Sequence, residues 1–149
     1  LATFAGVAAV LLALAGTALA AGAIKGATYS GRLKPAAGIP LIDGTPISLV
    51  VSESGQKVTV KMESFPLFCE GGGPPQLIRF KLAQVKNGKF STTGTETTEK
   101  QFGGELTSTA VVSGKFLAGG KARGSFEDKF TRAPSCGGKT TYHVAVEPG

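Results

Sequence analysis

The sequence predicts an all-β protein: a single antiparallel β-sandwich of about eight strands, immunoglobulin-like or jelly-roll-like, preceded by a signal peptide. Several segments alternate apolar and polar residues with period two, which is typical of half-buried strands. Turn-forming residues recur between these segments, and glycine supplies 22 of the 149 residues, a high share for a helical protein. After the N-terminal region, no stretch of ten or more residues shows an apolar period of 3.6. Short strands joined by tight turns are the pattern of a sandwich.

The chain opens with an uncharged run that is typical of an export signal. Residues 1–24 contain no charged side chain, and residues 7–15 have the length of a signal-peptide apolar core. Residues 18–20 (Ala-Leu-Ala) match the small-x-small cleavage pattern, so we expect cleavage after Ala20. Without an initiating Met or a basic segment, this signal (1–20) is expected to be N-terminally truncated. A retained membrane anchor is the alternative; no cysteine follows the run as a lipoprotein anchor requires.

Residues 21–149 are expected to form one domain with no internal linker. Alternation is clearest in three segments, 57–62, 77–82 and 121–130. Asn87-Gly88 is the strongest hairpin signal, because both residue types tolerate the positive φ that a tight β-turn requires. Weaker alternation predicts five further strands: 28–33, 46–51, 90–98, 106–116 and 139–146.

The phase of the alternation predicts which side chains enter the core. The even-numbered residues face inward in 77–82 and in 121–130, except that Asp128 is expected at a bulge or near the strand's end. In 139–146 the apolar side chains face the core, which places His143 on the opposite, solvated face.

The two cysteines, Cys69 and Cys136, are expected to form a disulfide. An even cysteine count in a chain bound for an oxidising compartment favours pairing. The alternative is two free thiols, one of them catalytic with His143 as its base.

The residues needed for most catalytic chemistry are absent or scattered. His143 is the only histidine, and no Gly-x-Ser-x-Gly sequence presents a nucleophile for it. One histidine and two distant cysteines do not make a zinc site. The main carboxylate candidates for hydrolysis lie on outward strand faces: Glu63, Glu96, Glu99 and Glu127. We therefore expect no enzyme activity, and keep a small carboxylate-based hydrolase as the alternative.

No cofactor, nucleotide or metal is expected. Gly138-Lys139-Thr140 resembles the end of a phosphate-binding loop, but that motif requires a glycine where Ala133 stands, and a strand pattern follows in place of a helix. The chain contains two Asp residues and no Asp-x-Asp-x-Asp calcium loop.

Positive charge is the remaining functional signal. The chain carries a net charge of +6, and outward strand positions concentrate it. Such a face attracts anionic cell-wall polymers, acidic polysaccharides, lipid headgroups or extracellular DNA. The alternative is that lysine keeps the sheet soluble and blocks its edges. Sugar binding by stacking is not expected, because Trp is absent and there are two Tyr. The predicted anionic-ligand face comprises Lys57, Lys61, Arg79, Lys81, Lys121, Arg123 and Lys129.

Five short motifs carry a resemblance to a known group: residues 65–69 (Phe-Pro-Leu-Phe-Cys), 87–90 (Asn-Gly-Lys-Phe), 112–116 (Val-Ser-Gly-Lys-Phe), 121–126 (Lys-Ala-Arg-Gly-Ser-Phe) and 136–139 (Cys-Gly-Gly-Lys). Over residues 27–147 the layout resembles small exported bacterial β-sandwich proteins that have a cysteine pair and no assigned activity. The resemblance implies an exported all-β domain and no catalytic or ligand residues. Gly-Lys-Phe also occurs twice, 26 residues apart, which we attribute to composition.

These observations together predict an exported, non-enzymatic binding or structural module at the cell surface or in the extracellular space. Its expected partner is an anionic cell-wall polymer or polysaccharide, with no nucleotide and no integral membrane segment after signal cleavage. A strand-pairing component of a surface assembly is the second alternative.

Overall fold

A computed structural model of the chain describes residues 22–35, 44–62, 78–98, 106–130 and 138–149. All regular structure in these ranges is β, which confirms the predicted class. No helix within them is long and apolar enough to cross a membrane. The strands, in chain order, are β1 (Thr28–Leu33), β2 (Pro46–Val51), β3 (Lys57–Lys61), β4 (Ala83–Gln84), β5 (Lys89–Thr98), β6 (Leu106–Leu117), β7 (Lys121–Phe130) and β8 (Gly138–Val146).

The eight strands belong to one antiparallel sheet, in the order β4-β3-β2-β1-β8-β7-β6-β5. β1 pairs with β2 on one side and with β8 on the other, so the N-terminal and C-terminal strands form a continuous ladder. The predicted two-sheet sandwich is therefore wrong. Alternation shows that one face of each strand is buried, which holds equally for two packed sheets and for one sheet that curls over itself.

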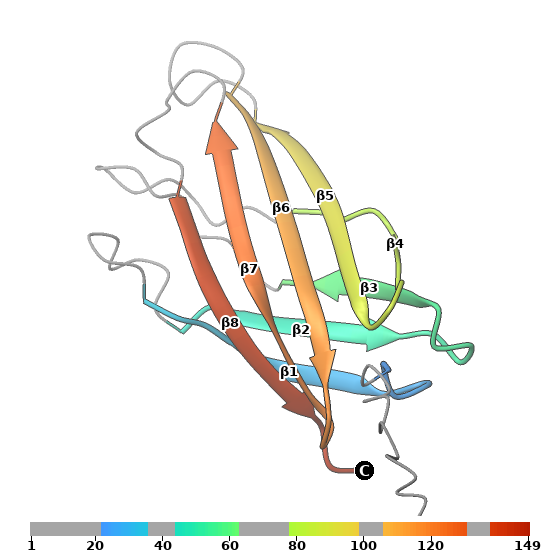
Figure 1. Ribbon diagram of the computed structural model, residues 1–149. Coiled ribbons are helices and arrows are strands. Elements are labelled where there is room, and N and C mark those ends of the chain that lie inside the picture. The colour runs from blue at the N-terminus through green and yellow to red at the C-terminus, as the bar shows by residue number, and fades with distance from the viewer. Residues whose placement is uncertain (1–21, 36–43, 63–77, 99–105, 131–137) are drawn as a thin grey trace, which may run out of the picture.

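The curled sheet is nearly closed and barrel-like. β1, β2 and β3 cross over β5 to β8 (Figure 1). Between the two ends of the strand order, Phe80 forms an isolated bridge with Gly94, and the Lys81 amide donates to the Thr93 carbonyl at 3.1 Å. The outer edge of β5 therefore has another part of the chain beside it along most of residues 89–94.

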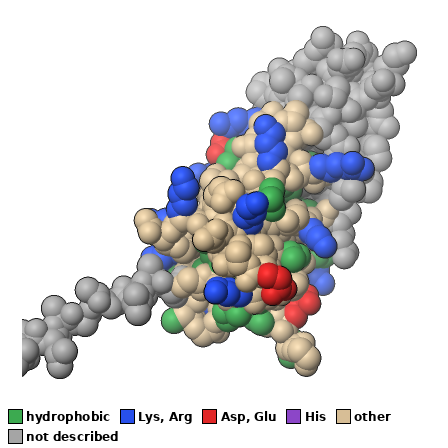
Figure 2. Space-filling view, turned by 90° about the vertical axis from the view of Figure 1, so that its right-hand side faces the viewer, with side chains coloured by type: hydrophobic (Ala, Val, Ile, Leu, Met, Phe, Trp, Pro, Cys, Tyr) green, Lys and Arg blue, Asp and Glu red, His purple; other side chains and the backbone are tan. Residues whose placement is uncertain are grey.

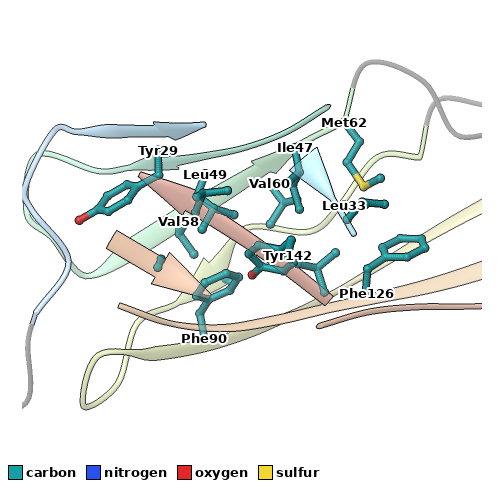
Figure 3. Close-up of a cluster of buried hydrophobic side chains, with 14 of the residues drawn as sticks. Tyr29, Leu33, Ile47, Leu49, Val58, Val60, Met62, Phe90, Phe126 and Tyr142 are labelled. Atoms are coloured by element: carbon teal, nitrogen blue, oxygen red, sulfur yellow. The ribbon is translucent and has the colours of Figure 1, made fainter. Parts of the chain in front are cut away.

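The core lies between the two crossing halves of the sheet (Figure 3). Side chains of β1 to β3, such as Leu49 and Val60, point toward Phe90, Phe126 and Tyr142 of the other half. Each is at most 5 % exposed, which marks this interior as the source of most of the apolar stabilisation.

Most predicted strand bounds are confirmed to within a residue. β1 and β2 begin and end at the predicted positions, and β5, β6 and β8 each extend one residue beyond them. The turn at Asn87-Gly88 is also confirmed. Both residues have positive φ (50° and 69°), and Lys86 and Lys89 exchange two backbone hydrogen bonds of 2.9 Å across it.

The predicted strand at residues 77–82 is wrong in extent and phase. Ile78 is buried, but Leu82 is 56 % exposed and the adjacent Ala83 is buried. Lys81 and Leu82 are both exposed, so the alternation shifts by one position here. Regular pairing is limited to the two residues of β4.

Of the two placements predicted for Asp128, the bulge is wrong, and the position near the end of the strand is confirmed, because β7 ends at Phe130. The register of β7 with β6 runs without interruption through Glu127, Asp128 and Lys129, so there is no bulge. Asp128 faces inward and is 1 % exposed. Its carboxylate accepts a hydrogen bond from the Ser108 hydroxyl at 2.7 Å, and this bond allows a polar side chain at an inward position.

Some predictions concern residues outside the described ranges. The predicted signal peptide, the predicted disulfide between Cys69 and Cys136, and the carboxylates Glu63 and Glu99 all lie there. Glu96 is in β5, but its side chain is not described.

Candidate functional site

Five outward-facing basic side chains form one row across five neighbouring strands. In the strand register, Lys89 of β5 is opposite Lys115 of β6, and Lys115 is opposite Arg123 of β7. Arg123 is opposite His143 of β8, which in turn is opposite Arg32 of β1. All five are exposed. Because neighbouring strands lie about 4.8 Å apart, this basic row is about 19 Å long.

The positive charges of the basic row are not compensated by acidic side chains in the described part of the chain. Like charges directly opposite each other in a sheet destabilise it, and the row contains two such pairs between Lys89 and Arg123. The one ion pair among the described residues joins Lys129 and Glu127 at 3.0 Å, farther along β7. Arg32 donates a hydrogen bond to the Gly44 carbonyl, which leaves its charge in place. The row therefore concentrates a positive field on the sheet surface.

A second outward row lies parallel to the first and carries hydroxyl groups. Ser91, Ser113, Ser125 and Thr141 are opposite one another across β5 to β8. The Ser113 and Ser125 hydroxyl oxygens are 3.0 Å apart and share a hydrogen bond. This hydroxyl row is two residues along each strand from the basic row, a separation of about 6.8 Å.

A shallow, open groove of about 530 Å³ lies between the two rows. Its lining includes four members of the basic row and three of the hydroxyl row, with Phe90, Gly114 and Gly124 between them. Phe90 is 5 % exposed and packs inward against Phe116, with ring centroids 5.6 Å apart. The groove therefore offers cations, hydroxyls and backbone, and no exposed aromatic face among its lining residues.

The two glycines beneath the groove are required by the packing on the inner face. Gly114 is opposite Gly124, and Gly124 is opposite Tyr142. A Cβ added to either glycine would lie 2.5 Å from the Tyr142 hydroxyl oxygen. That hydroxyl donates to the Ser113 carbonyl at 3.0 Å, and burial raises the pKa of Tyr142 above its ordinary value. Tyr142 therefore supports the groove from below as a neutral donor.

The structure distributes the seven cations of the predicted face over several parts of the sheet. Arg123 belongs to the basic row, and Lys121 lies two residues before it on the same face of β7. Lys129 is at the far end of β7, paired with Glu127. β3 is separated from β7 by three strands in the sheet order. One view of the surface shows cations spread over the described part rather than gathered in one patch (Figure 2). The other four cations lie on β3 or before β4: Lys57, Lys61, Arg79 and Lys81.

Sequence reasoning missed four members of the basic row: Arg32, Lys89, Lys115 and His143. The repeated Gly-Lys-Phe contained a signal for two of them. The two copies pair antiparallel, so that lysine is opposite lysine and the Phe90 position is opposite Gly114. His143 was correctly predicted to be exposed, but its alignment with Arg123 and Arg32 depends on register and strand order, which a single strand pattern does not specify.

Glu127 and Asp128 do not form a catalytic pair of carboxylates. Glu127 and Asp128 are adjacent in β7, so their side chains point to opposite faces of the sheet. The Lys129 ammonium lowers the pKa of Glu127, whereas burial raises the pKa of Asp128 to about 6. In the described ranges no group of three His, Cys, Asp or Glu side chains is placed to hold a metal ion.

Comparison with known proteins adds no further assignment. No protein-family model matches the sequence, and no significant match was found among curated proteins or solved structures.

Proposed function

We propose that this protein is an exported, non-enzymatic binding module that holds an anionic polymer in the groove beside the basic row. The observation that carries the proposal is the row itself: basic side chains directly opposite one another on five strands, without acidic partners in the described part. Such an arrangement costs stability, and a bound polyanion would relieve the repulsion. The signal-like N-terminus supports action at the cell surface or beyond it.

A polymer fits the row better than a small anion does. The row is about 19 Å long and its charges point outward from an open groove, so no single small anion touches all of them. A polyanion with repeated charges neutralises several cations together and releases their counterions, which makes the affinity strongly dependent on salt.

The test is binding of the purified protein to a soluble polyanion and to neutral dextran at 50 mM and 200 mM salt. With about four cations engaged, we expect polyanion affinity to fall about 100-fold between these concentrations. The double variant K115Q/R123Q should weaken binding by about tenfold or more. The matched control K57Q/K61Q removes the same charge from β3 and should bind almost normally. Equal losses in both variants would show that net charge, and not the row, is responsible.

A second candidate function is strand pairing within a surface assembly. β3 extends to Lys61, beyond its short ladder with β4, which ends at Val58, so the backbone groups of Val60 that point to this edge have no strand partner among the described residues. Exposed strand edges accept a strand from another chain. Sedimentation at increasing protein concentration tests this candidate, because an assembly module self-associates and a monomeric polymer binder does not.

A further inference from the structure

We infer that the polymer is a linear acidic polysaccharide lying across the strands, with its acid groups on the basic row and its hydroxyl groups on the hydroxyl row. This inference rests on the proposed function and specifies the ligand's chemistry. The evidence for it is the hydroxyl row, whose uncharged side chains contribute nothing to a purely electrostatic attraction.

The direction of the ligand follows from the register. Both rows run perpendicular to the strands, because each is made of directly opposed residues on β5 to β8. The groove between them follows the same line, and its lining draws on all four strands. A chain lying in the groove therefore meets a new basic side chain and a new hydroxyl with each strand it crosses, about every 4.8 Å. A ligand lying along one strand would meet Arg123 and Ser125 once only.

The hydroxyl row distinguishes a polysaccharide from other polyanions. Ser113 and Ser125 share one hydrogen bond of 3.0 Å, which leaves each oxygen able to make others. Hydroxyls both donate and accept, and so match sugar hydroxyls about 6.8 Å from the acid groups. Inorganic polyphosphate carries acceptor oxygens along its whole length and has no neutral edge of this kind.

Nucleic acid fits the groove less well. Proteins that bind single strands stack bases on exposed aromatic rings. Phe90, the aromatic residue in the groove lining, is buried and packed against Phe116. Without a stacking surface, a nucleic acid would be held through its phosphates alone, and the hydroxyl row would contribute little.

The chemistry of the basic row also suits carboxylate or sulfate groups on sugars. A guanidinium forms two parallel hydrogen bonds with a carboxylate, and Arg123 is near the middle of the groove. Lys89 and Lys115 supply flexible ammonium groups on one side of it.

The test compares polygalacturonate, inorganic polyphosphate and single-stranded DNA, matched in number of charges and measured at 50 mM salt. The variant S113A/S125A removes both hydroxyls of the central pair. Its control is S30A/S48A, which removes a hydroxyl pair between β1 and β2, with oxygens 3.3 Å apart, outside the groove lining. This variant also removes the hydrogen bond that the Ser30 hydroxyl donates to the Glu147 carboxylate. Thermal unfolding of each variant verifies that it is folded. The Tyr142 hydrogen bond is to the backbone of Ser113, so S113A/S125A retains it.

We expect the protein to bind polygalacturonate more tightly than the other two polymers. S113A/S125A should weaken that binding by about fivefold to tenfold and leave polyphosphate binding unchanged, whereas S30A/S48A should change neither. Equal binding of all three polymers, or equal effects of S113A/S125A on polygalacturonate and polyphosphate, would overturn the polysaccharide and leave an unspecific polyanion site. No salt-dependent binding to any of the three would overturn the proposed function as well.

Discussion

The charge state of the buried Asp128 affects the stability of the fold. It is 1 % exposed, and one of its carboxylate oxygens has no hydrogen-bond partner among the described residues. Burial raises its pKa from 3.8 to about 6, against the opposing effects of hydrogen bonds from the Ser108 hydroxyl and the Lys129 amide. Since the folded pKa exceeds the unfolded one, the folded state holds the proton more firmly, and deprotonation destabilises it.

The stability of the protein should therefore fall as the pH rises through about 6. The contribution of protonated Asp128 is fully present below pH 3.8 and is lost above pH 6, a difference of about 3 kcal/mol. D128N should flatten this dependence in urea unfolding measured between pH 4 and pH 7.5. E127Q changes the neighbouring carboxylate on the outer face and is the control. An unchanged slope in D128N would show that another group causes it.

Gly124 provides a second test at the residue scale. A Cβ at this position would overlap the Ser113 carbonyl oxygen and lie close to the Tyr142 hydroxyl, and the first of these is backbone that does not move easily. We expect G124A to lower the free energy of unfolding by about 3 kcal/mol, the upper end for overpacked sites. G22A, which has nothing within 4 Å of the added Cβ, should change it very little. Similar stabilities of the two variants would contradict the close packing beneath the groove.

At the scale of the strands, the cations of the ladder β5-β6-β7 that are expected to favour binding also destabilise the sheet. Lys115 lies between Lys89 and Arg123, so both of its cross-strand pairs are repulsive. K115E would convert them into attractive pairs and should stabilise the fold by about 1 kcal/mol in chemical unfolding. The same change should abolish binding of the polyanion. K61E is the control, since Lys61 is opposite Ser48. A destabilised K115E would show that the row is not under electrostatic strain.

The positions of the strands along the sequence were largely predictable, but the pairing between strands was not. Alternation is a local property, so it located β1 and β2 to the residue. It failed at residues 77–82, where exposed Lys81 and Leu82 are consecutive and the phase changes. Pairing of β1 with β8 joins residues more than a hundred positions apart, and no local pattern specifies that contact.

At the scale of the whole molecule, local sequence patterns were also insufficient to predict the candidate site. Arg123 was expected on a basic outward face, but the other four members of the basic row come together only through the strand order. Alternation gives the orientation of the side chains, so it predicts which of them share the outward face. A row requires the register between strands as well, and register depends on the whole sheet. The pairing of β1 with β8, in the middle of the strand order, extends the row to Arg32.

The position of His143 in this row predicts that a fixed charge placed there strengthens binding. Its cross-strand neighbours are Arg123 of β7 and Arg32 of β1, and Thr141 and Ala145 flank it on its own strand face. The variant H143R places a third guanidinium between these two arginines on the outer face of the sheet. A bound polyanion then gains one more cationic contact, so its affinity should rise.

We expect H143R to bind a sulfated polymer about fivefold more tightly than H143Q at one fixed pH. The dependence of affinity on salt should also be steeper for H143R, by roughly one released counterion. H143Q is the matched control, because it replaces the imidazole with a neutral polar side chain. Equal affinities and equal salt dependences of H143R and H143Q would show that this position does not contact the polymer.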